Sequence, residues 1–321
     1  MNDETELRDP PAARPARRRQ PQQRRAPRLE VNGWINLDKP VGVTSTQAVA
    51  QIKYLFTAKK VGHAGTLDPL ASGVLPIALG EATKTVPIVQ DGTKAYQFTV
   101  RWGEETDTDD AEGRIVATSE RRPTPEAIEA ALPAFTGVIS QTPPMFSAIR
   151  IAGERAYDLA RGGETFEIAA REIVIHRLTL VHANRDEARF EAECGKGAYV
   201  RAIGRDLGRV LGCHGHIVLL RRMRVGPFAA DHGVSLDALR EDPAACAAAL
   251  LPVEAGLAEL PRLAIDRTGA ATLRRGQKLM LRGADAPVEG PAYAACFGAP
   301  IAFGIVEGGY FVSTRVFNLP G

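Results

Sequence analysis

The chain has 321 residues, of which 45% are hydrophobic, so it can form one large domain and one small domain with proper cores. Its four cysteines lack Cys-x-x-Cys spacing, which argues against a disulfide framework and favours a reducing cytosol. The formal net charge is only +2, no apolar stretch is long enough to span a membrane, and no apolar run follows the N-terminal arginines as it would in a signal peptide.

The first 30 residues form an arginine- and proline-rich tail. Residues 10–29 hold seven arginines and five prolines, and no acidic residue. Removing these seven from the 40 basic residues leaves 33 against 38 acidic residues, so the rest of the chain carries a net charge of −5. We predict that the tail is disordered. It either holds nucleic acid loosely through phosphate contacts or serves only as a solubilising leader.

Residues 34–37 are predicted to form a short strand that leads into a turn at residues 38–40. Thr44 and Gln47, three residues apart, are typical of a capping box, and apolar residues at helical spacing predict a helix over residues 45–57. Lys59 and Lys60 follow this helix. They either contact phosphates, which we favour, or lie at a solvated helix end.

Residues 62–75, GHAGTLDPLASGVL, are the segment around which the chain is organised. Its glycines allow tight turns and close approach of the main chain to a ligand. Pro69 restricts the backbone of Asp68, so the carboxylate leaves the chain in a narrow range of directions, as a nucleophile requires. Asp-Pro is equally a common turn dipeptide, and a lone histidine such as His63 is usually structural.

Residues 95–102 alternate in polarity, which predicts a half-buried strand with Tyr96 on its apolar face. The acidic residues at 104–112 do not match a calcium loop, and we interpret them as a solvated loop. Thr124 and Pro125 open a predicted helix that ends at Gly137. Residues 135–163 then change character, with two consecutive prolines and several arginines.

Strands are predicted at residues 172–182 and 189–194, followed by a helix that starts after Tyr199 and ends at Gly212. Arg205 and Arg209 are expected on its solvated face. Residues 216–225 form a further predicted strand. Cys213, His214 and His216 lack the paired spacing of zinc ligands, so we expect no metal.

Ser235 is a predicted N-cap for an alanine-rich helix that runs to about residue 250. Beyond it, apolar runs at residues 292–297, 301–306 and 310–316 are broken by glycine and proline. This pattern predicts a small β-rich domain.

Six blocks of the sequence resemble, in order, the TruB family of pseudouridine synthases, which isomerise a uridine in the T-loop of transfer RNA. The blocks are LDKP (37–40), GHAGTLDPLASGVLPIALG (62–80), KAYQF (94–98), ETDTDDAEG (105–113), QTPPMFSAI (141–149) and CGKGAYVRAIGRDLG (194–208). The resemblance implies an α+β pseudouridine synthase fold, with a mixed or antiparallel central sheet flanked by helices. It further implies a catalytic domain over residues 31–250, a thumb-like insertion at about 135–163 and a PUA-like RNA-binding domain over residues 251–321.

The resemblance also assigns roles to individual residues. Asp68 corresponds to the catalytic aspartate and Arg201 to its arginine partner. His63, Tyr96, Tyr199 and Leu220 correspond to substrate-binding positions, with Tyr96 stacking on the uracil and Leu220 forming an apolar wall. The candidate RNA-backbone contacts are Lys39, Lys59, Lys60, Arg150, Arg155 and Arg161.

The reaction implied by the resemblance needs no cofactor and no metal. We expect a cytoplasmic monomer of the stand-alone bacterial type, which binds the T-arm of transfer RNA without a guide RNA and without a membrane. Two rivals predict other outcomes. A non-catalytic tRNA-folding module would tolerate changes at Asp68, and a phosphodiesterase using the acidic residues at 107–112 would need a metal.

Overall fold

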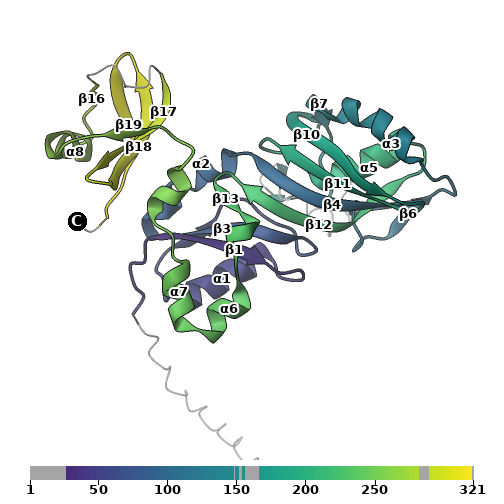
Figure 1. Ribbon diagram of the computed structural model, residues 1–321, viewed down its shortest axis with the longest axis horizontal. Coiled ribbons are helices and arrows are strands. Elements are labelled where there is room, and N and C mark those ends of the chain that lie inside the picture. The colour runs from purple at the N-terminus through teal and green to yellow at the C-terminus, as the bar shows by residue number, and fades with distance from the viewer. Residues whose placement is uncertain (1–26, 148, 152–153, 156–165, 282–288, 320–321) are drawn as a thin grey trace, which may run out of the picture.

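The computed structural model describes residues 27–147, 149–151, 154–155, 166–281 and 289–319 (Figure 1). Within these residues the chain forms a long mixed sheet flanked by helices and a separate small sheet near the C-terminus. The predicted α+β class, with a β-rich C-terminal part, is therefore confirmed. No helix of this described part combines the length and the apolar character needed to cross a membrane.

The long sheet contains ten strands among the described residues. They are β1 (Gly33–Lys39), β2 (Val61–His63), β3 (Ser72–Leu79), β4 (Lys94–Trp102), β7 (Gly137–Gln141), β10 (Arg171–Ala183), β11 (Glu187–Cys194), β12 (Gly215–Val225), β13 (Phe228–Ala229) and β14 (Val234–Ser235). The spatial order is β14-β1-β3-β12-β4-β11-β10-β7, with β2 beside β3 and β13 beside β12. Strands β3 and β12 are parallel, as are β1 and β14, and the other pairs are antiparallel.

The described helices are mostly short. They are α1 (Ser45–Leu55), α2 (Val86–Asp91), α3 (Pro125–Ala131), α5 (Val200–Val210), α6 (Leu236–Glu241), α7 (Pro243–Ala249) and α8 (Arg267–Arg274), with 3-10 turns η1 (Gly80–Lys84), η2 (Leu132–Phe135), η3 (Ala230–His232) and η4 (Val253–Leu257). The predicted capping box begins α1: Thr44 Oγ1 accepts the Gln47 amide hydrogen at 3.1 Å, and Gln47 Oε1 accepts that of Thr44 at 2.8 Å.

The core between the long sheet and α5 fixes strands β4 and β12. Phe98, Val100 and Trp102 are buried, as the alternation along β4 predicts. The ring of Phe190 in β11 lies 5.3 Å from that of Phe98 and meets Trp102 edge-on at 6.4 Å. Such pairs contribute about 0.5–1.5 kcal/mol each beyond their buried area. Leu220 belongs to the same cluster and Tyr96 packs against it, so this core also holds the strand positions that carry them.

The small sheet lies beyond one end of the long sheet (Figure 1). Its strands are β15 (Arg262–Ala264), β16 (Leu279–Met280), β17 (Gly290–Cys296), β18 (Ala299–Glu307) and β19 (Tyr310–Val316), in the order β15-β17-β18-β19-β16. The three predicted apolar runs fall in β17, β18 and β19, which confirms them. Leu251 and Trp34 exchange backbone hydrogen bonds at 2.8 Å, so the chain stays attached to β1 just after residue 250.

The predicted single helix from Ser235 to about residue 250 is wrong, because the structure has two helices, α6 and α7. Ser235 caps the first, as predicted, by accepting the Ala238 amide hydrogen. Asp242 is extended, with φ −131° and ψ 111°, since the following Pro243 disfavours a helical residue before it. Its side chain then caps α7 by accepting the Ala244 amide hydrogen at 2.8 Å.

Only part of the predicted thumb at residues 135–163 belongs to the described residues. That part contains β7 and a short hairpin of β8 (Arg150–Ile151) with β9 (Glu154–Arg155). Arg161 and residues 1–26 of the arginine-rich tail lie outside the described residues. A second hairpin, β5 (Glu104–Thr106) with β6 (Ile115–Thr118), brackets the acidic segment.

Candidate active site

Asp68 lies in the loop that joins the antiparallel strands β2 and β3. Ser45, the first residue of α1, holds this loop by donating its hydroxyl to the Leu67 carbonyl and accepting the Leu67 amide hydrogen, each at 2.9 Å. Gly73 has φ +103°, and a Cβ there would lie 2.2 Å from the Arg222 carbonyl oxygen, so only glycine allows β3 to pass β12 this closely. The loop is therefore held from both sides, while 34% of the Asp68 side chain stays exposed.

Lys39 is fully buried and contacts the same loop through the Pro69 carbonyl. Its ammonium group donates to three backbone carbonyls, those of Val43 at 2.7 Å, Pro40 at 2.9 Å and Pro69 at 3.5 Å. Burial lowers the pKa of Lys39 to about 8, against the opposing effect of the Asp68 charge. The prediction that Lys39 contacts the RNA backbone is therefore wrong, because its charged group faces the interior.

Arg201, in the first turn of α5, brings together parts of the chain that are far apart in sequence. Its Nη2 lies 2.9 Å from Asp68 Oδ2, and its Nη1 lies 3.3 Å from Asp110 Oδ2. The same guanidinium donates to the carbonyls of Thr108 and Phe146, each at 2.9 Å. Only 6% of the Arg201 side chain is exposed. The predicted pair of Asp68 with Arg201 is thus present, and a fixed fork holds the carboxylate.

The acidic segment is not the solvated loop that we expected, and Arg205 is not on a solvated face. Arg205 is buried and donates to Asp109 Oδ2 at 2.9 Å, one helical turn beyond Arg201. Burial raises the pKa of Asp109 to about 6, while the charge of Arg205 opposes this shift. Arg209, whose side chain is 53% exposed, pairs with the buried Glu105. The three arginines that lie four residues apart on α5 therefore each pair with an acidic residue of the β5–β6 hairpin. Their charges compensate each other within the protein.

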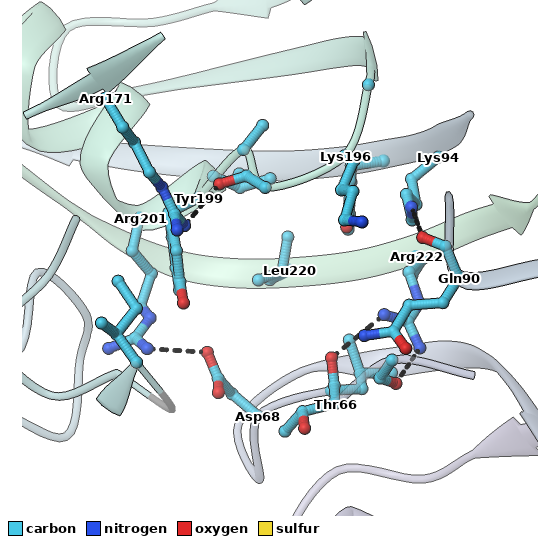
Figure 2. A pocket seen from close by; sticks show the side chains of 18 residues that line it. Thr66, Asp68, Gln90, Lys94, Arg171, Lys196, Tyr199, Arg201, Leu220 and Arg222 are labelled. Atoms are coloured by element: carbon cyan, nitrogen blue, oxygen red, sulfur yellow. Dashed lines mark hydrogen bonds and ion pairs between the residues drawn. The ribbon is translucent and has the colours of Figure 1, made fainter. Parts of the chain in front are cut away.

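A cavity of about 350 Å³ opens between Asp68 and the face of β12 (Figure 2). Its lining includes three of the predicted substrate-binding residues, Tyr96, Tyr199 and Leu220, together with Asp68 and Arg201. Figure 2 shows Asp68 facing Arg201, with Leu220 on the strand behind them. This volume falls in the usual range for small-molecule sites. The cavity is lined by apolar and aromatic groups and by several cationic side chains, and Asp68 is the one carboxylate among its described lining residues.

Gln141 holds the backbone of Tyr199, and Arg171 lies over its ring. Tyr199 exchanges two hydrogen bonds with Gln141, whose Oε1 accepts the Tyr199 amide hydrogen at 2.9 Å and whose Nε2 donates to the Tyr199 carbonyl at 3.1 Å. The guanidinium of Arg171 lies 5.2 Å from the centre of the Tyr199 ring and donates to the Gly197 carbonyl. Burial raises the pKa of Tyr96 above its usual value, although the nearby Arg222 lowers it.

His63 does not line the cavity that contains the tyrosines. It lies in a second cavity of about 520 Å³, which shares Asp68 and Arg201 with the first. Burial, reinforced by the charge of Arg222, lowers the pKa of His63 below its usual value of 6.5. The imidazole is therefore neutral at physiological pH, and it lines a different cavity from Tyr96.

The remaining predicted RNA contacts differ in how far the structure describes them. Lys59 and Lys60 are exposed, and Lys59 pairs with Glu30 at 2.7 Å. Arg150 and Arg155 occupy paired positions of the β8–β9 hairpin. For all four, contact with RNA remains a prediction.

The sequence patterns did not single out several residues of the site, and Asp110 and Arg222 are the most deeply buried of those discussed. Asp110 lies behind Arg201, and Arg222 is buried beside the Asp68 loop. A signal for Arg222 existed, because it follows Leu220 by two residues on a strand and must share its face. For Asp110 the signal was the four-residue spacing of the arginines on α5. If that face of the helix packs against the protein, its arginines need buried acidic partners.

The two histidines that follow Cys213 both lie near groups of the β5 strand. His216 Nδ1 lies 2.9 Å from the Glu104 carbonyl, and His214 Nδ1 lies 3.3 Å from Glu105. Within the described ranges, no group of three or more His, Cys, Asp or Glu side chains is arranged to hold a metal ion.

Two family models match this fold and site. Residues 53–200 match a model described as "TruB family pseudouridylate synthase (N terminal domain)", and residues 201–258 match the "tRNA pseudouridylate synthase B C-terminal domain". The first match contains Asp68, Tyr96 and Tyr199, and the second contains Arg201. The fold and the site therefore define a pseudouridine synthase, an enzyme of the isomerase class.

Individual relatives match nearly the whole chain. A protein of Bradyrhizobium diazoefficiens named tRNA pseudouridine synthase B is 59% identical over 315 residues, which cover 95% of this chain and 91% of the relative. A protein of Agrobacterium fabrum with the same name is 55% identical over 92% of this chain and 98% of its own length. The chain belongs to the TruB family of pseudouridine synthases.

Solved structures share the fold at lower identity. The chain in "Crystal Structure of a Cbf5-Nop10-Gar1 Complex" aligns with a TM-score of 0.70 at 24% identity, covering 89% of this chain and 84% of that chain. The chain in "Structure of H/ACA RNP bound to a substrate RNA containing 2'-deoxyuridine" gives 0.69 at 24% identity, covering 90% and 85%. These likenesses support the overall fold.

Proposed function

We propose that this chain isomerises the uridine at position 55, in the T-loop (TΨC loop) of transfer RNA, to pseudouridine, with Asp68 as the essential catalytic residue. The observation that carries the proposal is the 2.9 Å pair of Asp68 with Arg201 beside a cavity walled by Tyr96, Tyr199 and Leu220. The relatives named tRNA pseudouridine synthase B support transfer RNA as the substrate.

The reaction rearranges one nucleoside and needs no cofactor. The bond from base N1 to ribose C1′ breaks, the uracil turns, and a bond forms from C1′ to C5. The proton on C5 leaves and N1 gains one, so the reaction involves no redox change. Asp68 either attacks C1′ or removes a ribose proton. Both roles require an ionised carboxylate, and the guanidinium at 2.9 Å is its ion-pair partner.

The uridine must leave its stack to reach Asp68, at a cost of a few kcal/mol. Tyr96 stacks on the everted base, which offsets this by about 1–3 kcal/mol. Leu220 forms the apolar wall, and Tyr199 contacts the base and positions the site. His63, from the second cavity, fills the space left in the RNA or holds the flipped nucleotide.

RNA outside the site is bound by groups around it. The exposed Lys59 and Lys60, together with Arg150, Arg155 and Arg161 of the thumb-like insertion, contact the backbone of the T-arm. The C-terminal β-rich part serves as a PUA-like RNA-binding domain. The protein acts as a monomer in the cytoplasm, without a guide RNA.

The experiment is to map pseudouridine in transfer RNA from cells with and without the gene, and from cells that carry only Asp68→Asn. Loss of pseudouridine from the T-loop without the gene, not restored by Asp68→Asn, is the expected result. The alternative, a non-catalytic tRNA-folding module, would leave the modification in place in both strains. Purified wild type that retains activity in a strong chelator excludes the metal-dependent rival.

A further inference from the structure

Arg222 is a buried cation next to the proposed catalytic loop. It lies on β12 with 3% of its surface exposed and lines the cavity together with Tyr96. Figure 2 shows it near Thr66, across the cavity from Arg201. Arg222 therefore flanks the Asp68 loop on the side that Arg201 does not reach.

The guanidinium of Arg222 makes hydrogen bonds to the loop that carries Asp68 and to the start of β3. Three bonds go to the Asp68 loop and its following strand: Nη2 donates to the Gly65 carbonyl at 3.2 Å, Nη1 to that of Thr66 at 3.1 Å, and Nε to that of Val74 at 2.8 Å. Tyr96 is the direct neighbour of Arg222 across the β4–β12 pair, both residues line the cavity, and burial raises the pKa of the Tyr96 hydroxyl while the charge of Arg222 opposes this shift. One side chain thus bonds to the loop that carries Asp68 and lies next to the residue whose ring faces the base.

The charge of Arg222 has no obvious structural need. Within the described part of the chain its hydrogen-bond partners are three carbonyl oxygens, with no carboxylate among them. Burying an unpaired charge is costly, and an apolar side chain of similar size would fill the space at lower cost. The five donors of a planar guanidinium do, however, suit three separated acceptors, which one ammonium group cannot reach together.

We propose that Arg222 is a positioning residue that fixes the separation of Asp68 from Tyr96. This inference rests on the proposed function, in which the ring of Tyr96 holds the uracil and Asp68 acts on the ribose of the same nucleotide. With the loop bonded to the guanidinium and the ring next to it on β4, the carboxylate meets the ribose in a constant geometry. A displacement of about 1 Å between reacting groups can slow a reaction about a hundredfold.

The test compares Arg222→Lys with Arg221→Lys. Arg221 is the adjacent residue, and its side chain pairs with Asp38 at 2.8 Å outside the cavity, so the control makes the same substitution on the same strand. We expect Arg222→Lys to bind transfer RNA as wild type does and to be slower in single turnover by roughly ten- to a hundredfold per folded molecule. Arg221→Lys should keep the wild-type rate. An Arg222→Lys protein with the wild-type rate overturns the inference.

A second variant keeps the test decisive if Arg222→Lys does not fold. Tyr96→Phe keeps the ring and the buried charge and removes only the hydroxyl, whose pKa the neighbouring charge of Arg222 affects. It should slow single turnover without changing RNA affinity, whereas an unchanged rate overturns the link to Tyr96. Where both variants fold, the double variant should be no slower than the slower single variant, because each breaks the same connection. If wild type itself forms no pseudouridine, it is the proposed function that fails.

Discussion

Arg201→Ala perturbs the centre of the site most informatively. The change removes a guanidinium that contacts the carboxylates of Asp68 at 2.9 Å and Asp110 at 3.3 Å and the carbonyls of Thr108 and Phe146. Asp68 would keep its loop, which Ser45 and Lys39 hold from the other side, but its carboxylate would lose its orienting partner. We therefore expect a large loss of rate and a small loss of RNA affinity.

The magnitude follows from these contacts. A hydrogen bond to a charged group contributes about 1.5–3 kcal/mol, which corresponds to roughly ten- to 150-fold in rate. A carboxylate free to move by about 1 Å loses about another hundredfold. The two effects together predict a fall of roughly 10³- to 10⁴-fold.

Stability should fall as well, because Asp110 would be left buried without its cation, with only 4% of its side chain exposed. Breaking a buried pair by removing one partner costs about 3–5 kcal/mol. Urea denaturation of Arg201→Ala measures this loss. The rate must therefore be expressed per folded molecule.

The assay is single turnover with enzyme in excess over transfer RNA that carries tritium at C5 of uracil, since the reaction releases that hydrogen. Arg209→Ala is the matched control on the same helix, where the side chain is 53% exposed. Arg201→Lys keeps a charge, but one ammonium group cannot span Asp68 and Asp110, so its rate should lie between wild type and Arg201→Ala. A folded Arg201→Ala protein as fast as wild type would refute the reasoning.

Two further predictions concern titration. Burial and the charge of Arg222 lower the pKa of His63, so its NMR titration should have a midpoint below 6.5; a midpoint at or above 6.5 contradicts the described surroundings. The folded pKa of Lys39 is about 8, below the value of 10.5 for the unfolded chain, so the unfolded chain binds more protons between these values and the contribution of Lys39 to the unfolding free energy rises with pH. The unfolding free energy of wild type minus that of Lys39→Met should rise by about 1 kcal/mol from pH 8 to pH 9, and a constant difference would show that folding does not lower the pKa of Lys39.

Elements with local signals were predictable from the sequence. Thr44 and Gln47 mark the start of α1 through a contact three residues apart, and the alternation of Phe98 and Trp102 marks β4. These patterns depend on neighbours in the chain, so they need no knowledge of the fold. The break at Pro243 was missed although its signal is local, since the alanines on both sides suggested one continuous helix.

Buried charges were not predictable, because their partners lie far away in the sequence. Arg205 meets Asp109 across 96 residues, and both look like surface residues when read in isolation. Part of the burial of Lys39 comes from the Asp68 loop, whose Pro69 carbonyl lies 30 residues further along the chain. Within the site, the local pattern around Asp68 was compatible both with a catalytic residue and with a common Asp-Pro turn. The resemblance to a family supplied the partner Arg201, and the structure then showed the pair.

The most direct test is a comparison of wild type, Asp68→Asn and Asp68→Glu in single turnover, with the affinity for transfer RNA measured in parallel. Our account predicts that both variants bind the RNA nearly as wild type does and that neither forms pseudouridine at an appreciable rate, because one lacks the charge and the other displaces it by about 1 Å. Pseudouridine formed by Asp68→Asn at the wild-type rate would contradict it.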